Sequence, residues 1–224
     1  MKDIKLSKRL SAAAELCRKD SFIADVGTDH AYLPIYLASK GLIRGGVASD
    51  INKGPIDRAK AHIAEAGLKN IITAVRCDGL SELEAYSPED IFILGMGGEL
   101  IARIISDAPF VRNEGVRLIL QPMTHAEILR DTLCRSGFSI VFECFVKDEK
   151  IYQIICAEYT GEVYALSPFE LAVGKQNIEK RSPLLLEHLE HMERVMTDRI
   201  KGKALSCADT SEEEYFLKEI EKLK

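Results

Sequence analysis

Short apolar runs alternate with segments of helical periodicity along the first two-thirds of the chain. Five runs have the length of buried strands, and they are Phe22–Val26, Gly46–Ser49, Ile71–Arg76, Asp90–Leu94 and Val116–Leu120. Helical spacing of apolar residues is found in Ser7–Lys19, Ile56–Ala66, Glu99–Ser106 and His125–Ser136. Alternation of this kind predicts βαβ crossovers, and therefore a parallel sheet with helices on both faces.

The pattern changes after Gly137. Two apolar runs, Phe138–Val146 and Ile151–Glu158, are separated only by Lys147–Lys150. A connection this short predicts an antiparallel hairpin, because a parallel crossover needs a dozen residues or more. Five βα strands closed by a hairpin differ from the all-parallel sheet of a dinucleotide dehydrogenase and are typical of class I methyltransferases. We therefore expect an α/β Rossmann-like domain over residues 1–162, with a mostly parallel seven-stranded sheet.

The composition shifts beyond Tyr164 to Leu, Glu, Lys and Met, without strand signals. Ser167-Pro168 is a typical helix start, and Glu212–Lys224 forms a second helical segment after a turn within Gly202–Thr210. A heptad-like apolar stripe lies between them, at Leu184, Leu185, His188, Leu189, Met192, Val195, Met196 and Ile200. We expect a C-terminal α-helical coiled-coil hairpin over residues 163–224, in a monomer or at the contact of a weak dimer.

Composition narrows the class of protein. The 224 residues are 46% hydrophobic, which suffices for a full core. No apolar run is long enough for a membrane span, and the first residues lack a secretory signal, so we expect a cytoplasmic protein that does not bind membranes. The six cysteines form no CxxC pair, so we expect no metal. A net charge of −5 argues against coating nucleic acid generally but permits a local basic face.

Candidate ligand-binding residues follow the strands, because the ligand of an open α/β sheet lies at their carboxyl ends. Asp25 and Gly27 follow the first strand, and glycine there allows the backbone to turn close to a ligand. The full GxGxxG dinucleotide fingerprint is absent. Asp50, beside Ile51, ends the second strand at a spacing suited to a carboxylate that accepts hydrogen bonds from ribose hydroxyls. The alternative for Asp50 is a helix N-cap near Asn52.

The remaining strand ends extend this candidate pocket. Asp78 and Gly79 follow the third strand, where a carboxylate can hold the exocyclic amine of adenine. The fourth strand ends in Gly95-Met96-Gly97-Gly98, and such glycines indicate backbone close to a ligand, unless the segment is a plain loop. Gln121 and Pro122 end the fifth strand. Together the acids at successive strand ends predict a nucleoside pocket.

Three blocks carry a family resemblance over nearly the whole chain. Gly27-Thr28-Asp29-His30-Ala31-Tyr32-Leu33-Pro34, Gly95-Met96-Gly97-Gly98 and Leu120-Gln121-Pro122 resemble the bacterial tRNA (adenine-N1)-methyltransferases that modify adenine 22. The resemblance implies S-adenosylmethionine as methyl donor, tRNA as substrate and N1 of adenine as target. The cofactor residues would then be Asp25, Gly27, Asp50, Ile51, Asp78, Gly79, Gly95, Met96, Gly97, Gln121 and Pro122.

The chemistry of that target suggests catalytic residues. N1 of adenine carries an in-plane lone pair that attacks a sulfonium methyl directly when held in line. The (Asp/Asn)-Pro-Pro-aromatic loop of enzymes that methylate exocyclic amines is absent. Asp29 is our candidate for stabilising the charge that develops on the base; it would otherwise act as a base or cap the helix near Tyr32. His30 and Tyr32 would contact the flipped base or the cofactor, or simply pack.

Phosphate contacts should supply much of the tRNA affinity. The candidates are basic residues of the N-terminal helix and of the C-terminal hairpin, each of which could equally belong to a solvated helix face, and they are Lys5, Lys8, Arg9, Arg18, Lys175, Lys180 and Arg181. Two alternative functions stay open at this point. One is a methyltransferase acting on a small molecule or protein, and the other is a non-catalytic scaffold that docks a partner.

Overall fold

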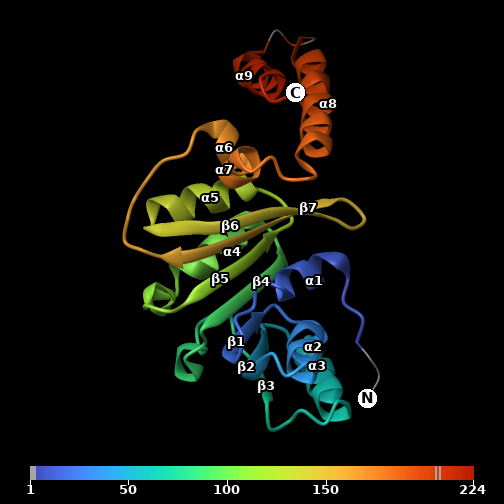
Figure 1. The fold of residues 1–224 in the computed structure, drawn as a ribbon, viewed down its shortest axis with the longest axis vertical. Coiled ribbons are helices and arrows are strands. Elements are labelled where there is room, and N and C mark those ends of the chain that lie inside the picture. Colours follow the sequence, from blue (N-terminus) through green and yellow to red (C-terminus); the bar gives the residue numbers. More distant parts are fainter. Residues whose placement is uncertain (1–3, 205, 207) are drawn as a thin grey trace.

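A seven-stranded sheet forms the centre of the molecule (Figure 1), whose computed structural model describes residues 4–204, 206 and 208–224. The strand order is β3-β2-β1-β4-β5-β7-β6, with β1 to β5 parallel and β7 antiparallel to both neighbours. The strands are β1 (Ser21–Val26), β2 (Ile43–Asp50), β3 (Ile72–Arg76), β4 (Asp90–Met96), β5 (Arg117–Pro122), β6 (Phe138–Lys147) and β7 (Ile151–Tyr159). The predicted mostly parallel sheet closed by an antiparallel hairpin is confirmed.

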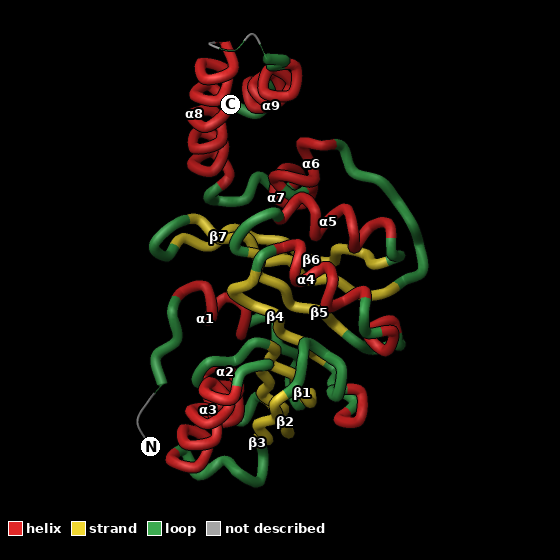
Figure 2. Tube along the Cα trace, turned by 180° about the vertical axis from the view of Figure 1, so that it is seen from behind, coloured by secondary structure: helices red, strands yellow, loops and turns green. Residues whose placement is uncertain are grey.

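Helices cover both faces of the sheet, as Figure 1 and Figure 2 show from opposite sides. One face carries α1 (Lys8–Ala14), α2 (Tyr32–Ser39) and α3 (Lys53–Glu65), and the other carries α4 (Gly98–Ser106), α5 (Ala126–Arg135) and the short helix η2 (Pro109–Arg112); η1 (Glu84–Tyr86) precedes β4. Separate apolar clusters seal the two faces, and a further cluster lies beneath α3. Phe92 packs with Leu37 of α2 on one face, while Ile93 packs with Ile101 and Leu129 on the other.

The N-terminal helix is shorter than the apolar spacing from Ser7 to Lys19 predicts. Ser7 caps it, since its side chain accepts a hydrogen bond from the backbone N–H of Leu10, and α1 ends at Ala14. The reason lies in the next residues, because the backbone N–H of Arg18 donates to the Asp90 carboxylate at 2.7 Å. A backbone group bound to a distant strand is unavailable for a helical hydrogen bond.

The C-terminal part contains the expected helical hairpin, formed by α8 (Leu185–Ala204) and α9 (Ser211–Glu221). Two short helices precede it, α6 (Pro168–Val173) and α7 (Lys175–Glu179), and they pack against α5 and β6. Packing therefore does not break at residue 162, and the division into domains at 1–162 and 163–224 stays a prediction. Gly202 lies inside α8 rather than in a turn, while residues 205 and 207 lie outside the described part of the chain.

Candidate functional site

The register of the parallel strands brings the predicted site residues to one edge of the sheet. Val26 of β1 pairs with Ser49 of β2 on one side and with Ile93 of β4 on the other. Asp50 pairs with Arg76, the last residue of β3. The strand ends that carry Asp25, Asp50, Asp78 and Met96 therefore meet at this edge, as the alternation of strands and helices predicts.

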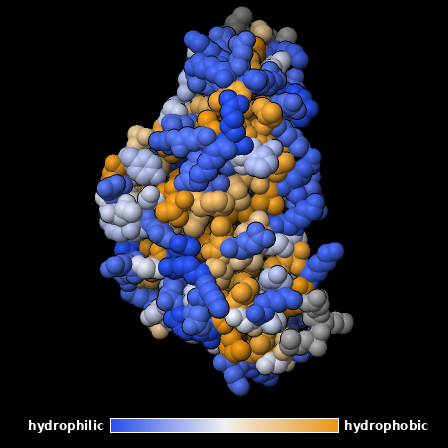
Figure 3. Space-filling model, in the orientation of Figure 1, coloured by the Kyte–Doolittle hydropathy of each residue, from blue (hydrophilic) through white to orange (hydrophobic). Residues whose placement is uncertain are grey.

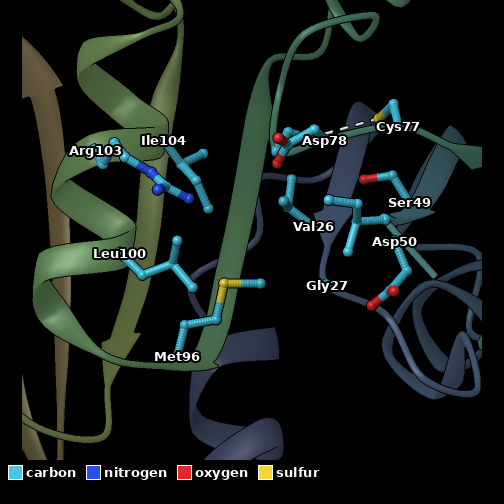
Figure 4. A pocket seen from close by; sticks show the side chains of 12 residues that line it. Val26, Gly27, Ser49, Asp50, Cys77, Asp78, Met96, Leu100, Arg103 and Ile104 are labelled. Atoms are coloured by element: carbon cyan, nitrogen blue, oxygen red, sulfur yellow. Dashed lines mark hydrogen bonds between the residues drawn. The ribbon is translucent and has the colours of Figure 1, made fainter.

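A first cavity opens at the ends of β1 to β4 (Figure 4). Figure 4 shows the carboxylates of Asp50 and Asp78 on one side and the apolar side chains of Leu100 and Ile104, from α4, on the other. Polar groups facing an apolar wall suit a nucleoside, whose ring is apolar on its faces and polar at its edges. The lining residues are Val26, Gly27, Ser49, Asp50, Ile51, Cys77, Asp78, Gly79, Met96, Leu100, Arg103 and Ile104.

Asp50 is not the cap of the following helix. The N-cap of α3 is Asn52, whose side chain makes no capping hydrogen bond, and the Asp50 carboxylate accepts a hydrogen bond from the Asn52 backbone at 2.7 Å. That contact fixes the orientation of the carboxylate at the mouth of the first cavity. In the same cavity the buried Ser49 hydroxyl interacts with the Cys77 thiol, whose pKa burial raises and this contact lowers.

A second cavity adjoins the first on the side of α1 and α2. Gly27 lines both cavities, so they meet at the turn after β1. At a φ of +76°, Gly27 adopts a backbone conformation that L-residues avoid, and a Cβ here would lie 2.0 Å from the Met96 methyl carbon. The lining residues of the second cavity are Arg9, Leu10, Asp25, Gly27, Thr28, Asp29, His30, Ala31, Tyr32, Leu33 and Leu94.

Asp25 is a buried carboxylate in the second cavity, with an exposed fraction of 8%. Burial raises its pKa to about 6, although a hydrogen bond with Thr28 acts in the opposite direction. Among the described residues no cationic side chain pairs with this carboxylate. An isolated buried acid beside an open cavity suits a ligand that brings its own positive charge, such as an ammonium group.

Asp29 forms an ion pair across the cavity rim instead of capping a helix. The N-cap of α2 is Ala31, at a φ of 56°, and its backbone N–H donates to the Thr28 hydroxyl at 3.0 Å. The Asp29 carboxylate accepts hydrogen bonds from Arg58 of α3 and lies 3.0 Å from the His30 Nε2. The alternative of a helix cap at Asp29 is therefore wrong, because Ala31 is the N-cap. The Arg58 hydrogen bonds, aided by the charges of Arg58 and the histidines, lower the Asp29 pKa.

Arg9 lies in the candidate site rather than on an open helix face. Its Nη1 donates to the Gln121 side-chain oxygen at 2.8 Å, and its guanidinium carbon lies 5.7 Å from the centre of the Tyr152 ring. The same Nη1 is 3.5 Å from the position of a Cβ on Gly95. Gln121 is thus connected to the second cavity through Arg9, while Pro122 lines a separate surface pocket beside Tyr152.

The glycines at the end of β4 and just after it have different roles. Gly98 is required for packing between loops, because a Cβ here would lie 2.1 Å from the His125 backbone oxygen. Gly97 is the N-cap of α4, and a Cβ on it would lie 3.3 Å from the Thr124 hydroxyl. Gly95 has a φ of +77° and is exposed beside Arg9. The prediction of ligand proximity therefore concerns Gly95 and Met96 more directly than Gly98.

The predicted phosphate-binding residues separate into groups. Arg18 lies at the opposite edge of the sheet, where its guanidinium pairs with Asp90 and donates to the carbonyls of Glu89 and Gly115, each at 2.7 Å. This geometry commits Arg18 to holding the N-termini of β4 and β5. Lys8 is exposed on α1, and Lys5 is exposed just before this helix.

The three residues predicted in the C-terminal hairpin lie in α7 and just after it. Lys175 and Lys180 contact neighbouring side chains of that segment, Glu179 at 3.8 Å and Gln176 at 2.7 Å, and Arg181 is exposed. The Lys180 ammonium also lies 5.6 Å from the centre of the Phe142 ring, which packs with the apolar cluster on the α1 side of the sheet. Figure 3 shows the face of the molecule that carries α1, with apolar surface across its middle and hydrophilic side chains above and below.

Several residues of the site carry no signal in the sequence pattern. Arg58 and His62, both on α3, reach the loop after β1 only because α3 packs beside α2, and His62 Nδ1 lies 3.1 Å from the His30 backbone oxygen. Leu100 and Ile104 have helical spacing on α4, which predicts a buried face but not a cavity wall.

Within residues 4–204, 206 and 208–224, no group of three or more histidine, cysteine or acidic side chains could hold a metal ion. In the same part of the chain, no helix combines the length and apolarity that crossing a bilayer requires.

Comparison with known proteins identifies close relatives. A family model described as "Methyltransferase domain" matches residues 6–155. The tRNA (adenine(22)-N(1))-methyltransferase of Bacillus subtilis is 31% identical over 98% of this chain and 94% of its own length. A candidate tRNA (m1A22) methyltransferase of Streptococcus pneumoniae, solved with S-adenosyl-L-methionine, superposes with a TM-score of 0.85 at 30% identity, covering 96% of this chain and 99% of that one. M. capricolum TrmK with S-adenosyl-homocysteine gives 0.79 at 25% identity, covering 97% and 96%.

Proposed function

Because the chain belongs to the family of bacterial tRNA (adenine(22)-N(1))-methyltransferases, we propose that it methylates N1 of adenine 22 in tRNA with S-adenosylmethionine as the donor. The observation that carries this function is the pair of cavities joined at Gly27. One has the walls of a nucleoside pocket, and the other places a buried acid beside exposed polar and aromatic side chains. A tRNA substrate implies that the enzyme works in the cytoplasm.

The first cavity suits the adenosine part of the cofactor. Asp50 would accept hydrogen bonds from the ribose hydroxyls, and Asp78 would accept one from the adenine amine, with Leu100 and Ile104 against the ring. In the second cavity Asp25 would pair with the ammonium of the methionine part. Arg9 would face its carboxylate, since both side chains line that cavity. This assignment gives Arg9 a role in the cofactor site in place of a phosphate contact.

The cofactor supplies an electrophilic methyl group on a sulfonium. The adenine N1 lone pair forms the new N–C bond while the S–C bond breaks, the bond electrons stay on sulfur, and the positive charge moves to the base. No proton leaves N1, so the enzyme needs no general base at this atom. Its task is to hold N1 in line at near-attack distance.

Asp29 would stabilise the positive charge that develops on the base. Its lowered pKa, caused mainly by hydrogen bonds from Arg58, keeps the carboxylate ionised. An ionised acid with a depressed pKa is a weak proton acceptor but an effective electrostatic partner for a cationic base. We therefore favour charge stabilisation over general-base catalysis, with His30 and Tyr32 contacting the base.

Replacing Asp29 tests this assignment. In the Asp29→Ala variant, methyl transfer to unmodified tRNA should fall by about 10²-fold or more, the range for loss of one preorganised electrostatic group. The dissociation constant for S-adenosylmethionine, measured by calorimetry, should change less than about threefold, because Asp25 and Asp50 are retained. Asp57→Ala is the matched control, since Asp57 is an exposed acid on α3 whose ion pair, within the described part of the chain, is with Lys53 of the same helix. Unchanged turnover in Asp29→Ala would remove Asp29 from the mechanism.

The phosphate contacts are proposed for the basic residues on the α1 side of the molecule. Lys8 is exposed on α1, Lys5 is exposed just before it, and Lys180 borders that face at Phe142. Lys175 and Arg181 are exposed on α7 and just after it. A protein with a net charge of −5 needs such a local basic surface to hold tRNA. The whole proposal is tested by incubating tRNA with the enzyme and S-adenosylmethionine and mapping 1-methyladenosine by mass spectrometry. If adenine 22 stays unmethylated, the proposal is refuted.

A further inference from the structure

Three aromatic rings form one cluster at the rim of the second cavity. The ring centres of His30 and Tyr32 are 4.9 Å apart with planes inclined by 11°. His62 lies 5.2 Å from His30 and 5.5 Å from Tyr32, inclined by 26° and 15°. We call these three side chains the ring cluster. His62 belongs to α3 and the other two to the start of α2 and the loop before it, so the cluster exists only in the folded chain.

Polar contacts hold the two histidine rings by their edges. His62 Nδ1 lies 3.1 Å from the His30 backbone oxygen, and His30 Nε2 lies 3.0 Å from Asp29. Tyr32 keeps 43% of its surface exposed although it is a large aromatic residue. Because the rings stack on one another, each covers part of its neighbours' faces, and the aromatic surface left to a ligand is that of Tyr32 and His62, which line a cavity. Aromatic surface of this kind is a stacking surface for nucleobases.

A third cavity, open to solvent, lies against the ring cluster, and Tyr32 and His62 line it. Tyr32 lines both this cavity and the second one, so the two are adjacent. Ile4 and Ile35 give the third cavity an apolar floor, and Ser39 and Glu65 add a hydroxyl and a carboxylate. Ala66, Tyr32 and His62 complete its described lining, which contains no lysine or arginine. The lining therefore suits a base rather than a phosphate.

We propose that the His62 side of the ring cluster and the third cavity bind the base of the nucleotide next to the target adenine, which itself contacts His30 and Tyr32. This inference rests on the proposed function. A target base that leaves its stack deprives its neighbour of a stacking partner, and the ring cluster would replace that partner about one nucleotide away from Asp29. Glu65 accepts hydrogen bonds but donates none when ionised. The cavity thus favours an unpaired base that carries an exocyclic amino group.

Variants of His62 separate stacking from a merely structural role. His62→Ala should raise KM for tRNA about tenfold, within the range measured for loss of one aromatic stacking partner. The affinity for S-adenosylmethionine should stay within about threefold of the original, because His62 lines neither of the two cavities assigned to the cofactor. His62→Phe restores a stacking face without the Nδ1 contact and should return KM to within about threefold. Lys60→Ala, an exposed change on the same helix, is the control.

The outcomes are distinguishable. An unchanged KM in His62→Ala, with tRNA still methylated, would overturn the inference and leave the proposed function standing. A KM that rises equally in His62→Ala and His62→Phe, or a rise accompanied by a lower melting temperature, would assign His62 to the structure of the loop. Failure of the unaltered enzyme to methylate tRNA would instead refute the proposed function.

A fluorescent base reports the contact directly. 2-Aminopurine, which carries an exocyclic amine, is placed in tRNA on either side of the target adenine, and its fluorescence is quenched when it stacks. Binding to the unaltered enzyme and to His62→Phe should quench it at one of the two positions, and His62→Ala should not. Equal fluorescence changes in all three proteins, or no quenching at either position, would overturn the inference.

Discussion

Single residues of this protein acquire their chemistry from burial and from partners distant in sequence. Asp25 and Asp29 are four positions apart, yet burial raises the pKa of Asp25 to about 6 while Arg58 lowers that of Asp29. In the free protein the raised pKa means that Asp25 binds a proton more tightly when folded than when unfolded. Its ionisation therefore costs about 3 kcal/mol of folding stability above pH 6, at ~1.4 kcal/mol per pKa unit. A cationic ligand would offset this cost.

The raised pKa predicts how cofactor binding depends on pH. Only the ionised Asp25 pairs with an ammonium, so the affinity for S-adenosylmethionine should be constant near pH 7 and weaken as the pH falls through 6. Asp25→Asn should bind about tenfold or more weakly at pH 7 and lose the dependence between pH 5 and 7. Calorimetry at several pH values measures both effects, and the cofactor's own amino and carboxyl groups keep their charges over this range. Parallel pH profiles for the two proteins would contradict the assignment.

At the scale of elements, a buried ion pair joins β6, the outermost strand of the sheet, to the C-terminal helices. Arg130 of α5 and Glu143 of β6 have side chains exposed by 0% and 1%, with 2.5 Å between Nε and Oε1. The Arg130 guanidinium also donates to the Leu171 carbonyl of α6 at 2.7 Å and to Gln153 of β7 at 2.6 Å. These contacts position α6, on which Phe169 packs against Phe216 of the helical hairpin. The ion pair thus helps to determine where the hairpin lies.

Removing one partner of this pair should be far more damaging than removing an equivalent surface pair. Glu143→Gln leaves the guanidinium buried without a counter-charge, which we expect to lower the free energy of unfolding by about 3–5 kcal/mol. Asp131→Asn breaks the exposed pair with Arg135 on the same helix as Arg130 and should cost less than about 1 kcal/mol. Urea denaturation of both variants tests the contrast, which equal losses would contradict.

At the scale of the whole molecule, an acidic protein must present its basic residues on one side to hold tRNA. Lys8 lies on α1, and Lys180 contacts Phe142, a residue that packs with the same apolar cluster as α1. Arg18, which follows shortly after Lys8 in the sequence, is instead bound to Asp90 at the opposite edge of the sheet. The sheet therefore separates basic residues that are neighbours in the sequence into an exposed set, which we propose binds tRNA, and a set that holds the strands together.

The salt dependence of tRNA binding tests which basic residues contact phosphates. Removing a side chain that binds one phosphate should reduce the slope of log affinity against log salt by about 0.7–0.9, so Lys8→Ala and Lys180→Ala should each flatten the dependence of tRNA binding. Lys69→Ala is the control, because Lys69 precedes β3 at the edge opposite the cavities and is exposed. Filter binding over a range of salt concentrations provides the slopes. If Lys69→Ala changes the slope as much as Lys8→Ala and Lys180→Ala do, the proposed phosphate contacts are contradicted.

The sequence by itself determined the sheet, its closing hairpin and the positions of Asp25, Asp50 and Asp78 at one edge. The physical reason is that the hydrophobic period is local, and parallel crossovers bring successive strand ends together whatever the side chains do. Only the tertiary structure decided which side chains meet there. Arg58 reaches Asp29 across 29 positions and Arg9 reaches Gln121 across 112, because such partners depend on how helices pack on the sheet, which no local pattern of apolar residues encodes.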